Sequence, residues 1–454
     1  MKILLYGIHY APELTGAGKA TGELAAWLAE SGHDVRVVTG HPFFPQWKRV
    51  SGLSSWRYAR EDDRSVKVWR APHIVPARPT ATKRFLQGLS FALSSLPLLA
   101  RQLAWRPDVV WVASPTLATA PGAWLLARAC SARTWLHVRR LDTDRASATQ
   151  APPTLRQRVA DALERAALSL FDRVSAASQS MLARLHQRGV GFERLVLFPH
   201  WVDTNAVRPL AKPSALRRMY GIDDREVVAL YAGALEEGRG LEVVANAARI
   251  LERHTPVTFV FCGQGPDQDE LDSWCDGLSN IRFLSLQPAA LLNDLLNLAD
   301  IHVLPMAPGR DDVAIPSKLV GMLASGRPVV ATVRPDTPVA RYVNERGLIV
   351  PPNDPHALAA ALASLALAPG RRARLGQAAR AFATRNTDID FVLGRFERGL
   401  YDLLASSLPP SAHPYDLPVE TAGEFRPMPR RGAGGASVLP EADVASDPRV
   451  SPAR

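Results

Sequence analysis

The sequence predicts an α/β fold with two parallel sheets, because one succession of elements occurs twice along the chain. A strand, a glycine-rich loop, a helix and a second strand follow one another over residues 2–39 and again from residue 227 onward. Such βαβ units start doubly wound sheets. The 454 residues, at about 150 per domain, suit two or three domains. We therefore expect two Rossmann-like domains in tandem, with one long α/β domain as the alternative.

Local composition predicts each element of the first βαβ unit, residues 2–39. Residues 2–7 form a short aliphatic run typical of a strand, and the loop behind it contains Gly16 and Gly18. Residues 23–30 place Leu and Trp side chains on one face of a helix, and 34–39 (DVRVVT) reads as the next strand.

The second unit repeats this order with different residues. A strand is expected at 227–232 (VVALYA), a glycine loop at 233–240 (GALEEGRG) and a helix at 241–254. The next strand, 257–262, ends in a turn with two glycines, Gly263 and Gly265.

Changes in composition divide the chain. We place a first domain at 1–205 and a second at 206–390, joined near a polar stretch with several prolines. An amphipathic helix over 391–408 is expected to pack back across the join. The tail, 409–454, is rich in Pro, Ala, Gly, Ser and Arg, and we expect it to be disordered.

Composition excludes several classes of protein. Hydrophobic residues make up 47% and charged residues 22%, as in soluble globular chains. Three cysteines without a CxxC pair argue against a disulfide framework or a cysteine zinc site, and favour a reducing compartment. The sequence has no apolar run long enough to span a bilayer, and MKILLYG reads as a strand, not a signal peptide.

The net charge of +10 is compatible with three kinds of partner: nucleic acid, an anionic membrane surface or phosphate-rich substrates. Residues 83–106 have basic ends and an apolar centre. Such a segment is typical of a helix in a membrane interface, or of a buried helix of the first domain.

Glycine loops between a strand and a helix can hold phosphate, because backbone N–H groups there lie at the positive end of the helix dipole. Gly16 and Gly18 fit this pattern, and so do Gly233 and Arg239 in the second loop. A tight turn explains either loop equally well.

The segment PSKLVGMLASGRP is more informative. Ser317 and Lys318 come just before a helical run, and Asp312 lies in the preceding loop. A hydroxyl and a cation together suit a diphosphate. An N-capped surface helix with a solvated lysine is the alternative.

His137 ends the strand-like run 134–138, where a side chain of an α/β sheet reaches the ligand crevice. A merely structural histidine is the alternative. Asp142 and Asp144 spell DxD, which we discount as a metal site because two tandem sheets do not suit the fold that uses this motif.

Taken together, the motifs resemble family 4 glycosyltransferases with the GT-B fold, and in particular the WcaI-type enzymes of colanic acid and related polysaccharide synthesis. KILLYGIHYAPELTGAGKATGELAAWLAESGHDVRVVT carries the resemblance in the first domain. YAGALEEGRGLEVV, VFCGQGPDQDEL and IPSKLVGMLASGRPVVAT carry it in the second. The resemblance covers about residues 1–405 and implies two Rossmann-like domains facing a central cleft.

The resemblance also implies roles. The family transfers a sugar with retention from a nucleoside-diphosphate donor, GDP- or UDP-linked, bound mainly by the second domain, with the acceptor on the first. Arg239, Ser317 and Lys318 fall at the donor phosphates, and His137 falls beside the transferred sugar. The catalytic residues we expect are His137, Arg239 and Lys318, and the donor-binding residues are Gly16, Gly18, Gly233, Ser317, Asp312, Gly263 and Gly265. No metal is expected, because fixed cations replace it.

Three residues depart from the pattern of relatives: Arg140, Ala234 and Gly321. We expect a cytoplasmic enzyme, peripheral on the inner membrane surface, that adds a sugar to a lipid-linked saccharide in exopolysaccharide synthesis. The partners are then the nucleotide-sugar donor and that acceptor, without nucleic acid. A GT-B nucleotide-sugar epimerase and a non-catalytic nucleotide-sugar-binding subunit remain as alternatives.

Overall fold

The computed structural model describes most of the chain: residues 1–13, 16–43, 47, 56–63, 65–76, 80–114, 117–139, 141, 154–210, 214–236, 239–307 and 315–405. The expectations for Asp312, for Asp142 and Asp144, and for the tail 409–454 fall outside the described residues. Residues 1–415 cluster as one compact unit, and this unit contains two separate sheets.

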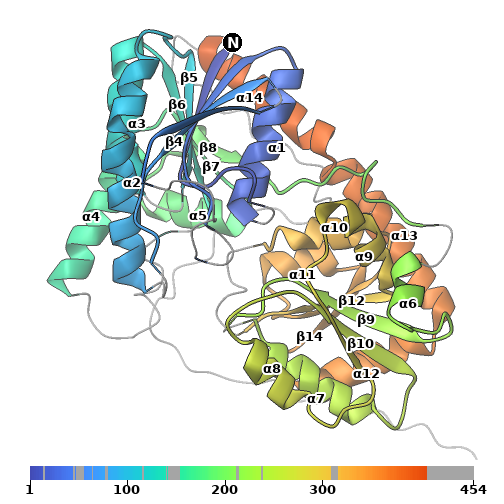
Figure 1. Ribbon diagram of the computed structural model, residues 1–454. Coiled ribbons are helices and arrows are strands. Elements are labelled where there is room, and N and C mark those ends of the chain that lie inside the picture. The colour runs from blue at the N-terminus through green and yellow to red at the C-terminus, as the bar shows by residue number, and fades with distance from the viewer. Residues whose placement is uncertain are drawn as a thin grey trace, which may run out of the picture. The chain divides into compact units, whose positions relative to one another are not determined.

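The first sheet has eight strands in the order β3-β4-β2-β1-β5-β6-β7-β8 (Figure 1). All neighbours are parallel except β3, which pairs antiparallel with β4. Its strands are β1 Lys2–Tyr6, β2 Asp34–Gly40, β3 Ala59–Asp63, β4 Val66–Ala71, β5 Val109–Ser114, β6 Arg133–Val138, β7 Arg173–Ala176 and β8 Leu195–Leu197.

Helices cover both faces of this sheet. The chain moves across the sheet in one direction through α2, α3, α4 and α5, and in the opposite direction through α1, so right-handed crossovers put α1 on the other face. The helices are α1 Gly16–Glu30, α2 Ala81–Gln102, α3 Ala120–Cys130, α4 Leu155–Ser169 and α5 Gln179–Gln187, with the 3-10 turns η1 Leu117–Thr119 and η2 Phe192–Arg194.

The second sheet has six parallel strands in the order β11-β10-β9-β12-β13-β14. Its strands are β9 Val227–Ala232, β10 Val257–Cys262, β11 Ile281–Leu284, β12 Ile301–Pro305, β13 Val329–Thr332 and β14 Gly347–Val350. Around it lie α6 Ala215–Met219, α7 Leu241–Leu251, α8 Gln268–Trp274, η3 Ala289–Leu291, α9 Leu292–Leu298, α10 Lys318–Ala324, α11 Pro338–Val343, α12 Pro355–Ala366 and α13 Pro369–Asn386. The core under α7 and α12 occupies one face, and a smaller core that includes residues of α6 and α9 occupies the other.

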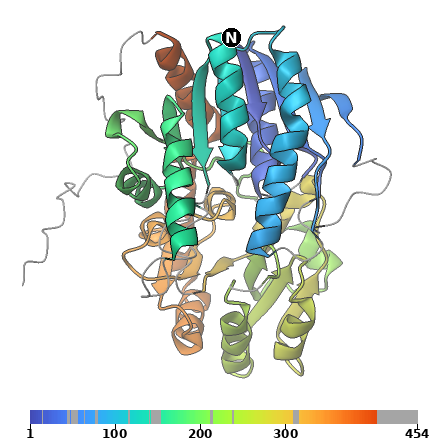
Figure 2. The ribbon, with the colours of Figure 1, turned by 90° about the vertical axis from the view of Figure 1, so that its left-hand side faces the viewer.

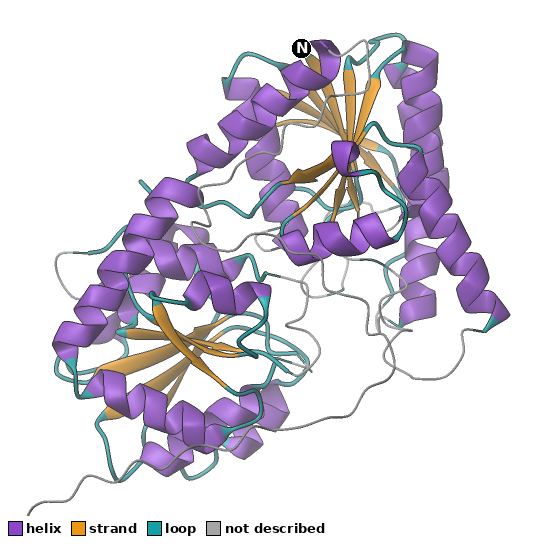
Figure 3. Ribbon diagram, turned by 180° about the vertical axis from the view of Figure 1, so that it is seen from behind, coloured by secondary structure: helices purple, strands orange, loops and turns teal. Residues whose placement is uncertain are grey.

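The last described helix, α14 Ile389–Ala405, returns to the first sheet although the second domain precedes it in sequence (Figure 3). Phe396 and Leu400 belong to the same buried cluster as Ile3. Polar contacts hold the helix as well, since the Trp27 indole N–H donates to Asp390 over 2.8 Å. Burial of this apolar face makes α14 part of the first domain's core.

Helix α2 is apolar on both sides. Phe91, Leu98 and Leu99 are buried against the sheet, while Phe85 and Leu93 are each 60% exposed. The inner face of this helix is therefore part of the core of the first domain, and its outer face leaves large apolar side chains in solvent. None of the helices among the described residues is long and apolar enough to cross a bilayer.

Candidate active site

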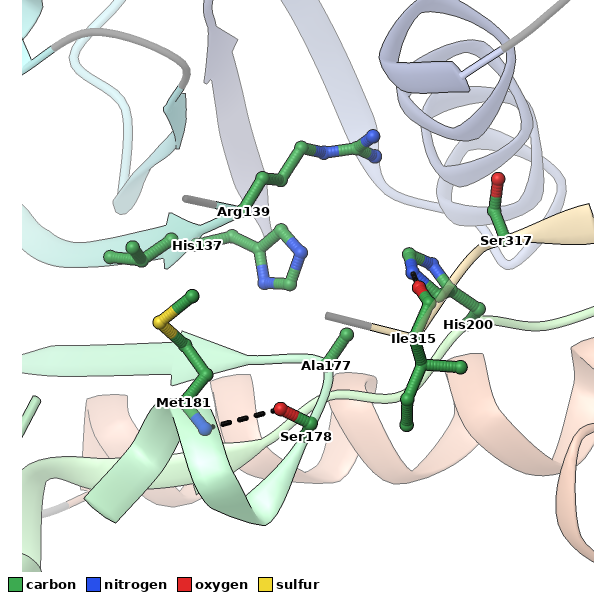
Figure 4. A pocket seen from close by; sticks show the side chains of 9 residues that line it. His137, Arg139, Ala177, Ser178, Met181, His200, Ile315 and Ser317 are labelled. Atoms are coloured by element: carbon green, nitrogen blue, oxygen red, sulfur yellow. Dashed lines mark hydrogen bonds between the residues drawn. The ribbon is translucent and has the colours of Figure 1, made fainter. Parts of the chain in front are cut away.

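A cavity of about 170 Å³ lies at the carboxyl ends of three neighbouring strands of the first sheet (Figure 4). His137 and Arg139 come from the end of β6, Ser178 follows β7, and His200 follows β8. Ser317 lines the cavity from the second domain. Parallel α/β sheets gather ligand-binding residues at this edge, which makes the cavity the candidate active site.

His137 is buried and held in a fixed orientation. Its Nδ1 lies 3.1 Å from the Ser175 hydroxyl, and its ring stacks on Trp111. The Ser175 hydroxyl donates to the carbonyl oxygen of Leu136 over 3.4 Å, and its oxygen accepts the Trp135 indole N–H at 2.9 Å. Burial, and then the charge of Arg139, hold the pKa of His137 well below its usual value, so the ring is neutral at pH 7.

His200 is the second neutral imidazole at the cavity. Its Nε2–H donates to the carbonyl oxygen of Ile315 over 3.0 Å, since a carbonyl can only accept. Burial and the charge of Arg139 lower the pKa of His200 to about 4. Its Nδ1 is therefore an acceptor for a hydroxyl group, and its Nε2 links the first domain to the segment that precedes α10.

Arg139 brings a positive charge to the same cavity. Its Nε is buried and has no hydrogen-bond partner. Burial lowers the pKa of its guanidinium to about 10, which leaves it charged at pH 7. The cavity thus combines two neutral histidines with one cation.

The second domain brings a separate pair of cations together. The Lys318 Nζ lies 4.1 Å from the centre of the Tyr231 ring, and a Cβ built on Gly233 would lie 3.1 Å from that nitrogen. The Arg239 guanidinium pairs with Glu236. Burial, then the charge of Arg239, lower the pKa of Lys318 to about 7. Two adjacent cations at the end of β9 are suited to the charges of a diphosphate.

Gly263 and Gly265 support this loop. A Cβ built on Gly263 would lie 1.9 Å from the Gly233 carbonyl oxygen, and one on Gly265 would lie 1.8 Å from that of Leu235. Backbone hydrogen bonds join the same loops, with Gly233 N–H to Cys262 O at 2.9 Å. These glycines let the loops after β9 and β10 lie against each other, so they position Gly233.

The first glycine loop has a different environment. Gly16 begins α1, and a Cβ built on Gly18 would lie 2.4 Å from the Glu13 Cβ. The Glu13 carboxylate is buried and lies 2.8 Å from His9 Nδ1. Neither glycine lines the described cavity.

The structure therefore gathers His137 and Ser317 at one cavity, and Gly233, Arg239 and Lys318 around Tyr231. Ser317 is the N-cap of α10 and is exposed, without a side-chain capping bond. Sequence reasoning did not identify Arg139, Ser178 and His200 as site residues. Each lies within three residues of the end of a parallel strand, a position that could have identified them.

Two family models match the chain. The "Glycosyl transferase 4-like domain" covers residues 15–201, and "Glycosyl transferases group 1" covers residues 226–367. The matches coincide with the domains that contain the first and the second sheet.

One curated relative is similar over almost its whole length. WcaI of Escherichia coli (strain K12), named as a colanic acid biosynthesis glycosyl transferase, is 37% identical over 87% of this chain and 98% of its own. Among solved structures, sucrose-phosphate synthase from Thermosynechococcus elongatus has a TM-score of 0.70 at 18% identity, covering 90% of this chain and all (100%) of that one. HepE of Anabaena, solved with UDP-glucose, has a TM-score of 0.65 at 16% identity, covering 88% of this chain and 100% of that one. These structural neighbours share the arrangement of two Rossmann-like domains, and the chain belongs to the WcaI-type family of glycosyltransferases with the GT-B fold.

Proposed function

We propose that the protein transfers a sugar, with retention of configuration, from a nucleoside-diphosphate donor to a lipid-linked saccharide during exopolysaccharide assembly. The observation that carries the proposal is the pair of cations, Lys318 and Arg239, next to a cavity that contains His137. The diphosphate would lie on the cations and the transferred sugar in the cavity. HepE, which shares the fold, was solved with UDP-glucose, and this supports a nucleotide-sugar donor.

The residues would act mainly by position and charge. In a front-face displacement the leaving diphosphate takes the proton of the acceptor hydroxyl as the new bond forms. Lys318 and Arg239 would stabilise the negative charge that develops on the leaving oxygen. We propose that these fixed cations serve in place of a metal. Neutral His137 would hydrogen-bond the sugar and hold its reacting carbon in place.

The epimerase alternative has less support. Such enzymes abstract a proton from the sugar and need an acid and a base in the cleft. No carboxyl group belongs to the cavity lining among the described residues, and its two histidines are neutral with lowered pKa values.

A thermal-shift screen against GDP, UDP, dTDP and their common sugars tests donor binding. A ligand at a hundred times its dissociation constant stabilises the folded state by about 2.7 kcal/mol. We expect one base to raise the melting temperature and the others not to. No shift with any of them would contradict the proposal.

The proposed acceptor is a lipid, so we also propose that the enzyme rests on an anionic membrane surface through α2 and α4. These helices lie on the same face of the first sheet, together with α3 (Figure 2). Their outward apolar residues follow helical spacing: Phe85, Leu89, Leu93 and Leu96 on α2, and Leu155, Val159 and Leu163 on α4.

The charge of this face suits anionic lipid. Helix α2 contains Lys83, Arg84 and Arg101 and no acidic residue. The two acidic residues of α4, Asp161 and Glu164, both bind Arg188. Basic residues near such a surface contribute about 1 kcal/mol each to binding.

Vesicle sedimentation tests this placement. We expect the protein to bind phosphatidylglycerol vesicles and not phosphatidylcholine vesicles, and the double variant Leu93→Glu/Leu163→Glu to lose binding. Leu367→Glu is the control, because Leu367 is 73% exposed but lies in the second domain. Equal binding by the double variant and the wild type would exclude this face.

A further inference from the structure

The guanidinium of Arg139 has no counter-charge in the described structure. Its Nε is buried without a hydrogen-bond partner, and no ion pair of Arg139 with a described residue is present. Arginine is ordinarily found buried where it pairs with a carboxylate or a phosphate. A cation that faces a cavity without such a partner among the described residues is suited to bind an anion from outside the chain.

The described residues that line the cavity do not supply that anion. His137 and His200 line the same cavity as Arg139, and the positive charge of Arg139 lowers the pKa of both histidines. Ser178 and Ser317 add hydroxyl groups to the lining, which are neutral. Figure 4 shows the Arg139 side chain running along the cavity above the His137 ring.

The cavity is also separate from the proposed diphosphate site. Neither Lys318 nor Arg239 belongs to the lining of this cavity, whereas Arg139 does. Lys318 lies against Tyr231 and Gly233 at the end of β9, and Arg139 follows the end of β6. Among the described residues, positive charge is therefore found at both of these strand ends.

We infer that Arg139 binds a second oxyanion of the substrates, distinct from the donor diphosphate. This inference rests on the proposed function, which places the diphosphate at Lys318 and Arg239. A guanidinium binds a carboxylate or a phosphate through two parallel hydrogen bonds. The anion is therefore either the carboxylate of a transferred uronic acid or a phosphate of the acceptor.

Titration calorimetry on the full chain separates these two sources. The probes are a nucleoside-diphosphate glucuronic acid, the matching glucose compound, which lacks only the carboxylate, and farnesyl phosphate as a short lipid phosphate. The base is the one found in the thermal-shift screen. The variants are Arg139→Gln, which removes the charge, and Arg139→Lys, which keeps the charge and loses the planar fork.

We expect Arg139→Gln to weaken one anionic probe by about 10- to 150-fold, the range for hydrogen bonds to charged groups, and to leave the glucose compound unchanged. Loss of glucuronic acid binding would identify the transferred sugar as the source. Loss of farnesyl phosphate binding would identify the acceptor. Arg139→Lys should retain part of the lost affinity.

Two outcomes would overturn the inference: equal weakening of the glucose and glucuronic acid compounds, or no weakening of either anionic probe. Failure of the proposed function is visible separately, because the wild type would then bind no nucleotide sugar. The melting temperature of the free protein adds a further check. Removal of an uncompensated charge should leave it unchanged or raise it, whereas loss of a structural contact would lower it.

Discussion

The two glycine loops follow the same sequence pattern, but their glycines lie against groups of opposite charge. In the loop that follows β1 in sequence, Gly18 packs against the buried carboxylate of Glu13. In the loop that follows β9, Gly233 packs against the ammonium group of Lys318. Both glycines allow a close approach that a Cβ would hinder, but the group that approaches is an anion in one loop and a cation in the other.

This difference teaches that a glycine between a strand and a helix indicates crowding and does not identify the ligand. The charge of the neighbouring side chain carries that information. The β9 loop is suited to bind a diphosphate through side chains as well as backbone. Among the described residues of the β1 loop, the buried carboxylate of Glu13 lies next to Gly18, and the nearby cation Lys19 pairs with Glu23.

The largest effect is expected for Lys318→Ala or Arg239→Ala. Each variant removes a charged hydrogen-bond donor from the proposed diphosphate site, so donor binding should weaken by about 1.5–3 kcal/mol. Titration calorimetry with the nucleotide sugar found in the thermal-shift screen measures the change. Unchanged affinity in both variants would remove these residues from the donor site.

Glu13→Gln is the matched test in the other loop. It removes a buried charge while keeping the shape of the side chain. If the two loops differ as their charges suggest, the dissociation constant of the donor should stay within a factor of two, against roughly tenfold or more for Lys318→Ala. A marked gain in donor affinity would instead place Glu13 close to the phosphates.

A stability effect of about 1–3 kcal/mol is expected for Gly263→Ala, the usual range for overpacking. The added Cβ would lie 1.9 Å from a backbone oxygen of Gly233, so the loop that holds Gly233 must move. Gly394→Ala is the control, since a Cβ there meets nothing within 4 Å and Gly394 lies inside α14. That variant should gain about 0.4–1 kcal/mol. Urea unfolding measures both, and equal stabilities would contradict the role of Gly263 as a close contact.

Much of the fold could be predicted from local pattern. Hydrophobic periodicity predicts both βαβ units, and the strand-like run 134–138 predicts that His137 lies at the end of a strand. The convergence of Arg139 and His200 could not be predicted, because it depends on β6, β7 and β8 being neighbours in the sheet. Such long-range pairing leaves no periodic signal in the sequence.

The outer face of α2 shows a second limit. Apolar residues on both sides of a helix indicate burial on both sides or an interface with lipid, and the sequence pattern alone does not distinguish these two environments. Only the packing of Phe91 inward and the exposure of Phe85 show which side faces the core. The charge without a partner at Arg139 is likewise a property of three-dimensional contacts.

The pH dependence of donor binding most directly tests the electrostatics of the β9 loop. The pKa of Lys318 is lowered to about 7 by burial and by Arg239, so the free enzyme loses this charge as the pH rises through 7. A bound diphosphate favours the charged form, and affinity should therefore be highest below pH 7 and fall above it. The protonated fraction of Lys318 drops from about 0.9 at pH 6 to about 0.1 at pH 8, which predicts up to about tenfold weaker binding, or roughly 1.4 kcal/mol.

Calorimetry with a nucleotide sugar is suitable for this measurement, because its diphosphate has no free terminal phosphate to titrate in this range. Lys318→Arg should flatten the profile, since a guanidinium stays charged throughout. An equally steep fall in that variant would assign the titration to another group, and a flat profile in the wild type would mean that Lys318 is not the cation that meets the donor.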